Sequence, residues 1–170
     1  LRVEELKEGD EGLVILRETP FYAESGGQVG DTGSLIGAAV QARVLDTFAP
    51  LSGLILHKSR IETGSIKVGD RVSAVVDEFK RDATRRNHTA THLVHAALKE
   101  VLGTHVKQAG SVVAPNYLRF DFTHYQPMSD AEIREVEDLV NRYILQNEPV
   151  ATNLMSIDDA MRSGAVAMFG

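Results

Sequence analysis

A change of pattern near residue 78 restricts the possible fold of this chain more than any other feature of its sequence. Before it, glycine turns separate several short β-rich runs, which lie at 12–17, 39–47, 54–57 and 71–76. After it, apolar residues recur at helical spacing over 78–102, and Gly103 is a stop signal for that helix. Because short strands joined by glycine turns are typical of small barrels, we predict a partly closed β-barrel over residues 1–78.

Residues 79–170 predict a second subdomain in which helices pack on an antiparallel sheet, so the expected fold class is α+β. Two strands are expected at 105–113 and 117–123, because residues 118–122 alternate apolar and charged side chains. Ser129 or Asp130 can cap a second helix that runs to about Asn147. A strand near 150–155 and a short helix over 157–163 follow. The buried stripe of the second helix should comprise Ile133, Val136, Leu139, Val140 and Ile144.

The composition is that of a globular protein and excludes several kinds of site. The 170 residues are 43% apolar and 25% charged, which suits a hydrophobic core. The absence of cysteine excludes disulfides, a cysteine-based zinc site and a thiol nucleophile within this chain. A net charge of −6 argues against tight, independent RNA binding. No apolar run suits a membrane span, and the charged N-terminal residues do not resemble a signal peptide. We expect a cytoplasmic protein, and an internal fragment because the chain starts without Met.

The predicted helix over 78–102 carries two histidines at metal-ligand spacing. His88 and His92 are four residues apart, so both imidazoles can reach one point on the same helical face. A third histidine, His95, lies one turn further along and is expected on that side. Thr89 stands where a zincin protease would have glutamate, so a metalloprotease is disfavoured. A coincidental pair of surface histidines explains this spacing at least as well when it is taken alone.

Three further features are ambiguous in isolation. The glycine-rich stretch over 19–33 lets the backbone approach a ligand, but it lacks the spacing of a Walker loop or a dinucleotide fingerprint and can be a structured turn. Gln108, expected at a buried strand position, must find a partner, so it either joins the sheet or points into a pocket. A basic cluster can contact phosphates or be a solvated helix start, and it contains Lys80, Arg81, Arg85 and Arg86.

Together these motifs resemble the editing region of alanyl-tRNA synthetases, and the resemblance covers nearly the whole chain. Residues 19–33 resemble the family's F-Y-x-E-S-G-G-Q-x-G-D-x-G motif, and residues 87–93 resemble its H-x-x-x-H motif. Residues 105–111 and 118–122 are similar to its Q-x-G-S and L-R-F-D-F segments. The final G-A-V-A-M-F-G resembles the family's G-A-x-A-L-F-G. In this order and spacing the motifs are highly specific.

The resemblance implies a zinc-dependent hydrolase that removes wrongly attached serine or glycine from tRNA for alanine, within an enzyme that also binds ATP. It implies a barrel subdomain followed by an α+β subdomain shared with threonyl-tRNA synthetases and freestanding editing proteins. His88 and His92 match the family's first pair of metal ligands, whereas its second pair, C-x-x-x-H, has no match here. We therefore expect zinc in the intact enzyme, and weak or absent zinc binding and no activity in this chain alone.

The resemblance also implies roles for individual residues. Thr19 matches a threonine that reads the serine hydroxyl and Gln108 would be a polar wall of the same pocket, so these two are the catalytic candidates. The expected partners are the acceptor end of tRNA for alanine and the rest of the synthetase chain, and no membrane. A freestanding editing protein of the same superfamily and a nonenzymatic tRNA-positioning module are the alternatives. Further substrate contacts are expected at Gly26, Gly27, Gln28, Gly110, Arg85 and Arg86.

Overall fold

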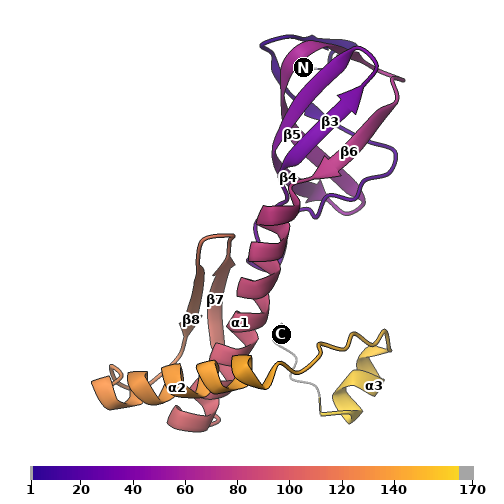
Figure 1. Cartoon of the computed structure of the whole chain (residues 1–170). Coiled ribbons are helices and arrows are strands. Elements are labelled where there is room, and N and C mark those ends of the chain that lie inside the picture. Colours follow the sequence, from indigo (N-terminus) through magenta and orange to yellow (C-terminus); the bar gives the residue numbers. More distant parts are fainter. Residues whose placement is uncertain (1, 165–170) are drawn as a thin grey trace. The chain divides into compact units, whose positions relative to one another are not determined.

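The computed structural model describes residues 2–164, and the chain divides into two compact units. The first unit contains the residues up to His88 together with Ser111–Arg119, and the second contains Thr89–Gly110 and the residues from Phe120 onward. Helix α1 (Glu78–Leu102) contributes to both units, as does the hairpin of β7 (Gln108–Val113) and β8 (Leu118–Phe122) (Figure 1). The G-A-V-A-M-F-G similarity lies, beyond its first glycine, outside the described residues.

The first unit is built on a six-stranded antiparallel sheet. The strand order is β1-β5-β4-β3-β6, and β2 pairs with another stretch of β5. The predicted α+β class is confirmed. The pairings among the described strands do not close the sheet, so a barrel stays a prediction. The strands are β1 (Glu5–Lys7), β2 (Glu11–Val14), β3 (Gly33–Gly37), β4 (Val40–Leu51), β5 (Leu54–Lys67) and β6 (Val72–Val76).

Strand β5 is much longer than the sequence pattern predicts. The pattern predicts a strand over 54–57 only, whereas β5 continues to Lys67 with alternating buried and exposed residues. Its inward positions include His57 and Ser59, which are both fully buried, followed by Ile61. Two polar residues at core positions hide the alternation from a search for apolar side chains. The short strands β1 and β3 have no counterpart among the predicted runs.

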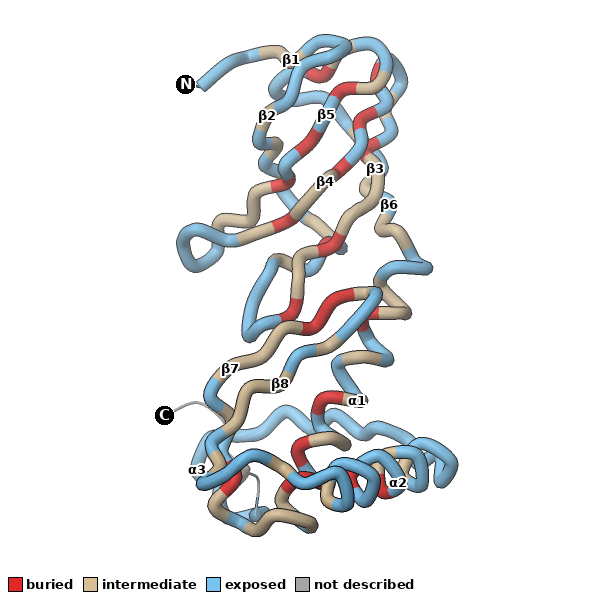
Figure 2. Tube along the Cα trace, turned by 90° about the vertical axis from the view of Figure 1, so that its left-hand side faces the viewer, coloured by how far each residue is buried: buried red, intermediate tan, exposed pale blue. Residues whose placement is uncertain are grey.

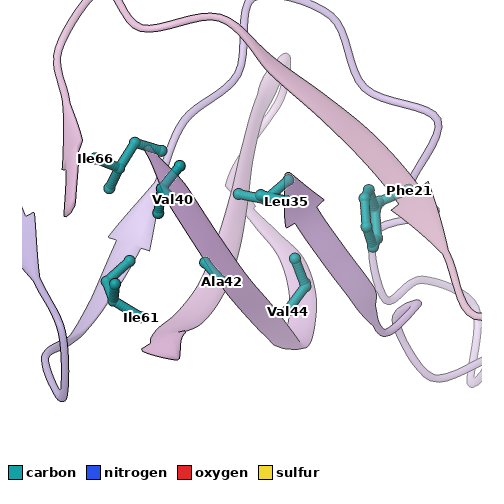
Figure 3. Packing of buried hydrophobic residues seen from close by; sticks show 7 residues of the cluster. All are labelled: Phe21, Leu35, Val40, Ala42, Val44, Ile61 and Ile66. Atoms are coloured by element: carbon teal, nitrogen blue, oxygen red, sulfur yellow. The ribbon is translucent and has the colours of Figure 1, made fainter. Parts of the chain in front are cut away.

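Seven buried side chains form the apolar core of the first unit (Figure 3). Leu35 of β3 and Ala42 of β4 are paired in register and fully buried. Burying one aliphatic or aromatic side chain of this kind contributes about 1.5–3 kcal/mol. Phe21 brings the glycine-rich stretch into this core, so the sheet fixes the position of that stretch. The core residues are Phe21, Leu35, Val40, Ala42, Val44, Ile61 and Ile66.

The second unit has its own apolar core between α1 and α2 (Asp130–Gln146), visible as the buried positions in Figure 2. Ser129 caps α2, as predicted, through a capping box with Glu132. Asn147 ends that helix in the left-handed conformation, with φ of 49°. A short helix, α3 (Ile157–Arg162), follows. None of the helices within residues 2–164 combines the length and the hydropathy that a membrane span needs. The core residues are Ala97, Leu98, Val106, Val136 and Leu139.

Three predicted details are wrong. Residues 150–155 form no strand, because this exposed segment has no regular secondary structure and no pairing strand beside it. Ile133 and Ile144 are 41% and 52% exposed, so α2 buries a narrower stripe than predicted. His95 is buried against Phe120, with ring centroids 5.0 Å apart, whereas His92 is exposed. His95 therefore belongs to the core side of α1, one turn from the buried Leu98.

Candidate functional site

The glycine-rich stretch contains a tight turn that requires glycine. Ser25 and Gln28 exchange both backbone hydrogen bonds, at 3.2 and 3.0 Å, and the two residues between them, Gly26 and Gly27, have φ of 59° and 84°. Positive φ at both central positions is the arrangement of a type I′ turn. A Cβ on Gly27 would also lie 2.4 Å from the Ser111 carbonyl oxygen. That position therefore has no room for a side chain.

This turn brings Gln28 into contact with His88 of α1. The Val113 N–H donates to the Gly27 carbonyl at 2.8 Å, and the Val29 N–H donates to the Val113 carbonyl at 3.0 Å, so the backbone on both sides of Gln28 is held. Gln28 is 7% exposed. Its Oε1 atom lies 2.6 Å from Nδ1 of His88. The first unit thus brings together two residues that the sequence assigned to the site.

The hydrogen bond to Gln28 determines which nitrogen of His88 carries the proton. A carbonyl oxygen only accepts, so Nδ1 of His88 donates. The lone pair of the neutral imidazole is then on Nε2. Histidines that bind metals usually use one ring nitrogen for the metal and donate the other N–H to an oxygen. His88 is therefore held in the tautomer that can bind a metal through Nε2.

Asn87 fastens the same turn of α1 to the segment that follows β7. Its Nδ2 donates to the carbonyl of Ala114 at 2.7 Å and to that of Pro115 at 3.3 Å. Because Asn87 precedes His88, these bonds restrain the backbone that carries the imidazole. Segments 25–29, 87–88 and 111–115 thus meet around His88 in the first unit. Sequence reasoning missed Asn87, although its place beside His88 in the histidine motif was an available signal.

His92 lies exposed on α1, four residues after His88, and it belongs to the second unit. Among residues 2–164, no group of three or more His, Cys, Asp or Glu side chains is arranged to hold a metal ion. Two further histidines of the second unit, His105 and His124, contact each other, with Nε2 and Nδ1 2.8 Å apart. The described residues therefore offer the histidine pair as a partial ligand set.

Thr19 lies half-buried in the first unit and contacts a histidine that sequence reasoning missed. Its Oγ1 lies 2.8 Å from Nε2 of His57 and accepts the Phe21 N–H at 3.1 Å. Nδ1 of His57 lies 2.9 Å from the Val14 carbonyl oxygen. Burial lowers the pKa of His57 below its ordinary value of 6.5, against the opposing effect of the Val14 carbonyl. The ring is therefore predominantly neutral at pH 7.

An ion pair joins the glycine-rich stretch to the start of α1. Nε of Arg81 lies 2.8 and 2.9 Å from the two carboxylate oxygens of Asp31, and its Nη2 donates to the Pro20 carbonyl at 2.9 Å. Asp31 is 8% exposed and also accepts the Tyr22 N–H at 2.6 Å. The hydrogen bond with Asp31 raises the pKa of Arg81 above its ordinary value. Arg81 of the predicted basic cluster therefore stabilises the fold, since its loss would leave the buried Asp31 carboxylate without its charged partner.

The two arginines predicted to contact the substrate, Arg85 and Arg86, are exposed on α1. Nη1 of Arg85 lies 3.2 Å from Oδ1 of Asp82, one turn earlier. The Arg85 side chain is 73% exposed, and helix-surface pairs of this kind contribute only about 0.3–0.5 kcal/mol. This pair therefore leaves the guanidinium accessible to another anion.

Gln108 and Gly110 lie on β7 in the second unit, whereas Thr19 and Gln28 lie in the first. The Oε1 atom of Gln108 is buried and has no hydrogen-bond partner among the described residues. Leaving such an oxygen unpaired costs about 1–3 kcal/mol, so it favours a bound donor. A Cβ on Gly110 would lie 2.7 Å from Oδ2 of Asp121, so a larger residue there would displace this carboxylate.

Comparison with known proteins places these features in a family. Residues 2–80 match the family model described as tRNA synthetases class II (A). The alanine–tRNA ligase of Myxococcus xanthus (strain DK1622) is 53% identical over 170 residues. Those of Rhodopseudomonas palustris (strain ATCC BAA-98 / CGA009) and Carboxydothermus hydrogenoformans (strain ATCC BAA-161 / DSM 6008 / Z-2901) are both 51% identical over 168 residues. Each match covers 99% of this chain and 19% of the ligase.

The matched regions include the glycine-rich turn and the histidine pair. Residues 2–80 are therefore similar to the class II (A) aminoacyl-tRNA synthetases. Because ligases that are 51–53% identical match 99% of its length, the chain belongs to the alanyl-tRNA synthetase family. It spans about a fifth of the length of the curated relatives that it matches.

Proposed function

We propose that this chain is the editing region of an alanyl-tRNA synthetase, which hydrolyses the ester of seryl- or glycyl-tRNA for alanine. The contact between Gln28 and His88 supports this proposal most directly, because it holds His88 in the tautomer that a metal site needs. The relatives whose matches cover 99% of the chain are ligases. This favours the proposal that the chain is part of a synthetase over the alternative of a freestanding editing protein. The proposal concerns the intact synthetase that contains this chain.

We assign His88 and His92 as two of the zinc ligands in that enzyme. The residues fit this role in part, since His88 is in the required tautomer and His92 follows at the ligand spacing. The remaining ligands are proposed to be the family's C-x-x-x-H pair. When bound, zinc supplies a Lewis acid or a fixed charge that orients the ester. Gln28 and Asn87 hold the His88 side chain and its backbone in place for that role.

Two residues are proposed to recognise the amino acid. Alanine, serine and glycine differ too little in size for a hydrophobic pocket to separate them strongly, whereas a hydrogen bond to an extra hydroxyl gives stronger discrimination. Thr19 would form that bond with the serine hydroxyl. The buried Oε1 of Gln108 has no partner among residues 2–164, so it would accept a hydrogen bond from a donor on the substrate, such as its amino group.

The remaining proposed contacts serve the tRNA acceptor end, the proposed partner together with the rest of the synthetase. The Gly26–Gly27 turn carries no side chains, so its backbone can approach the terminal ribose closely. Gly110 is proposed to contact the acceptor end through its backbone, since a Cβ there would lie 2.7 Å from Oδ2 of Asp121. Arg85 and Arg86 would contact the last phosphates, for which an accessible guanidinium is suited.

The test is hydrolysis of charged tRNA by the intact synthetase. Amino-acid release is measured from seryl-, glycyl- and alanyl-tRNA for alanine, without ATP, so that recharging does not occur. We expect the seryl and glycyl esters to be cleaved faster than the alanyl ester. Release at the spontaneous rate from all three, with tRNA binding retained, would indicate the nonenzymatic positioning module instead.

A further inference from the structure

We propose that His57 is a positioning residue that determines how Thr19 reads the substrate's side chain. It does so by accepting a hydrogen bond from the Thr19 hydroxyl. The Thr19 oxygen can then only accept a hydrogen bond from the substrate. This inference rests on the proposed editing function and extends it to a residue of the sheet interior. His57 and Thr19 both lie in the first unit, 38 residues apart in sequence.

The direction of each hydrogen bond around His57 follows from its partners. The Val14 carbonyl can only accept, so Nδ1 of His57 donates to it at 2.9 Å. In the neutral ring Nε2 is then an acceptor, and its contact with Thr19, at 2.8 Å, must be a donation by the threonine hydroxyl. Burial favours the neutral ring by lowering the pKa of His57.

This arrangement uses the only proton of the Thr19 hydroxyl. The backbone N–H of Phe21 donates to the same oxygen at 3.1 Å and occupies one of its two lone pairs. One acceptor position is left on Oγ1. Thr19 therefore suits a side chain that donates a hydrogen bond, as a serine hydroxyl does. It offers nothing to glycine or alanine, whose side chains have no donor.

His57 differs from the other polar residues that face the interior of this sheet. Ser59 is fully buried, and its hydroxyl donates to the backbone carbonyl of His57, at 3.1 Å. Thr47, also fully buried, donates to the Asp31 carbonyl at 2.9 Å. Both hydroxyls are satisfied by backbone groups. His57 is equally buried, yet one of its ring nitrogens is used by the side chain of Thr19, which is partly accessible.

Two substitutions in the intact synthetase separate the two ring nitrogens of His57. His57→Asn keeps a donor at the position of Nδ1 for the Val14 carbonyl and removes the acceptor for Thr19. His57→Gln places an amide oxygen near the position of Nε2 and can restore that acceptor. The measured quantity is the ratio of the seryl-tRNA to the glycyl-tRNA hydrolysis rate. If only part of a variant preparation is folded and active, both rates fall by the same factor and the ratio does not change. Ser59→Ala is the matched control, since Ser59 is the next inward-facing residue of β5 and its hydroxyl bonds to the His57 carbonyl, not to Thr19.

We expect His57→Asn to lower the seryl-to-glycyl ratio by about 2- to 13-fold, the range for one neutral hydrogen bond. Thr19→Val should lower it at least as much, and the double variant should lose no more than Thr19→Val alone, because His57 acts on the substrate only through the Thr19 hydroxyl. His57→Gln should recover part of the ratio, and Ser59→Ala should leave it unchanged. Equal slowing of both substrates by His57→Asn, or additive losses in the double variant, would overturn the proposal.

A measurement on the wild-type enzyme keeps the proposal testable if His57→Asn does not fold. A 3-fluoroalanyl ester matches serine in size but cannot donate a hydrogen bond from its side chain. It should be hydrolysed about 2- to 13-fold more slowly than the seryl ester. Equal rates would show that Thr19 does not accept a hydrogen bond from the substrate. That result would also overturn the positioning role proposed for His57. If wild-type enzyme hydrolyses neither seryl- nor glycyl-tRNA, the proposed function itself has failed.

Discussion

Nδ1 of His88 lies 2.6 Å from Oε1 of Gln28, although 60 residues separate them in sequence. This contact joins the two most distinctive motifs of the chain, the glycine-rich turn and the histidine pair. It gives Gln28 the role that an oxygen acceptor has beside many metal-binding histidines, where losing the partner typically lowers metal affinity about 10- to 100-fold.

The 170-residue chain alone should bind zinc weakly or not at all. Structural and catalytic zinc sites take at least three protein ligands, and the predicted motif supplies His88 and His92. Equilibrium dialysis followed by elemental analysis measures the stoichiometry. Tight binding of one zinc per chain would show that a third residue, such as His105 or His124, completes a site.

Gly27→Ala should destabilise the chain more than Gly53→Ala. Both glycines have positive φ, 84° and 78°, so both substitutions carry the backbone cost of about 1–2 kcal/mol. Only the methyl group at position 27 would meet backbone, the Ser111 carbonyl oxygen at 2.4 Å, whereas position 53 is open. Thermal unfolding should show a drop of a few degrees for Gly53→Ala and a clearly larger one for Gly27→Ala. Equal drops would mean that the turn does not pack against Ser111.

Stability should fall as the pH is lowered below about 6.5. Burial lowers the pKa of both His57 and His95 from the ordinary value of 6.5, so between the folded and unfolded pKa values the unfolded chain binds more protons. Their contribution is complete above that range and is lost as the pH falls through it. Urea unfolding at pH 5 to 8 measures the effect. His57→Gln should flatten the dependence, and an unchanged slope would contradict the buried neutral ring.

Removing the charge of Arg85 and Arg86 in the intact synthetase should weaken tRNA binding. Each lost phosphate contact should lower the slope of log affinity against log salt concentration by about one. Asp82→Asn is the control, because it releases Arg85 from its 3.2 Å ion pair without removing a cation and should not lower the slope. If the double substitution lowers thermal stability and leaves the slope unchanged, these arginines have a structural role only.

The sequence predicted elements well wherever one periodic signal ran without interruption. Helix α1 has the bounds expected from its apolar spacing, and the stop at Gly103 is confirmed by its φ of 114°. The end of β5 was missed because His57 and Ser59 occupy inward positions that normally hold apolar residues. The strand expected at 150–155 does not form, because a short run of residues does not by itself provide a partner strand for its backbone.

The site could be predicted as a set of residues but not as a set of contacts. The motifs indicate Gln28 and His88 separately, and only the folded chain shows that one orients the other. The contact depends on pairing between the Gly27–Val29 backbone and Val113, which no local pattern encodes. His57 was missed for a related reason, since a lone histidine in a strand has no spacing that indicates its partner, Thr19.

The central claim is that this chain carries the hydrolytic site, and single-turnover hydrolysis of seryl-tRNA by variants of the intact synthetase tests it most directly. Gln41→Leu, an exposed glutamine on β4, is the matched control for Gln28→Leu. We predict that Gln28→Leu slows hydrolysis about 10- to 100-fold and that His88→Ala slows it at least as much. Gln41→Leu should hydrolyse seryl-tRNA at the wild-type rate, and all three variants should charge tRNA with alanine at the wild-type rate. Hydrolysis at the wild-type rate by His88→Ala would contradict the account.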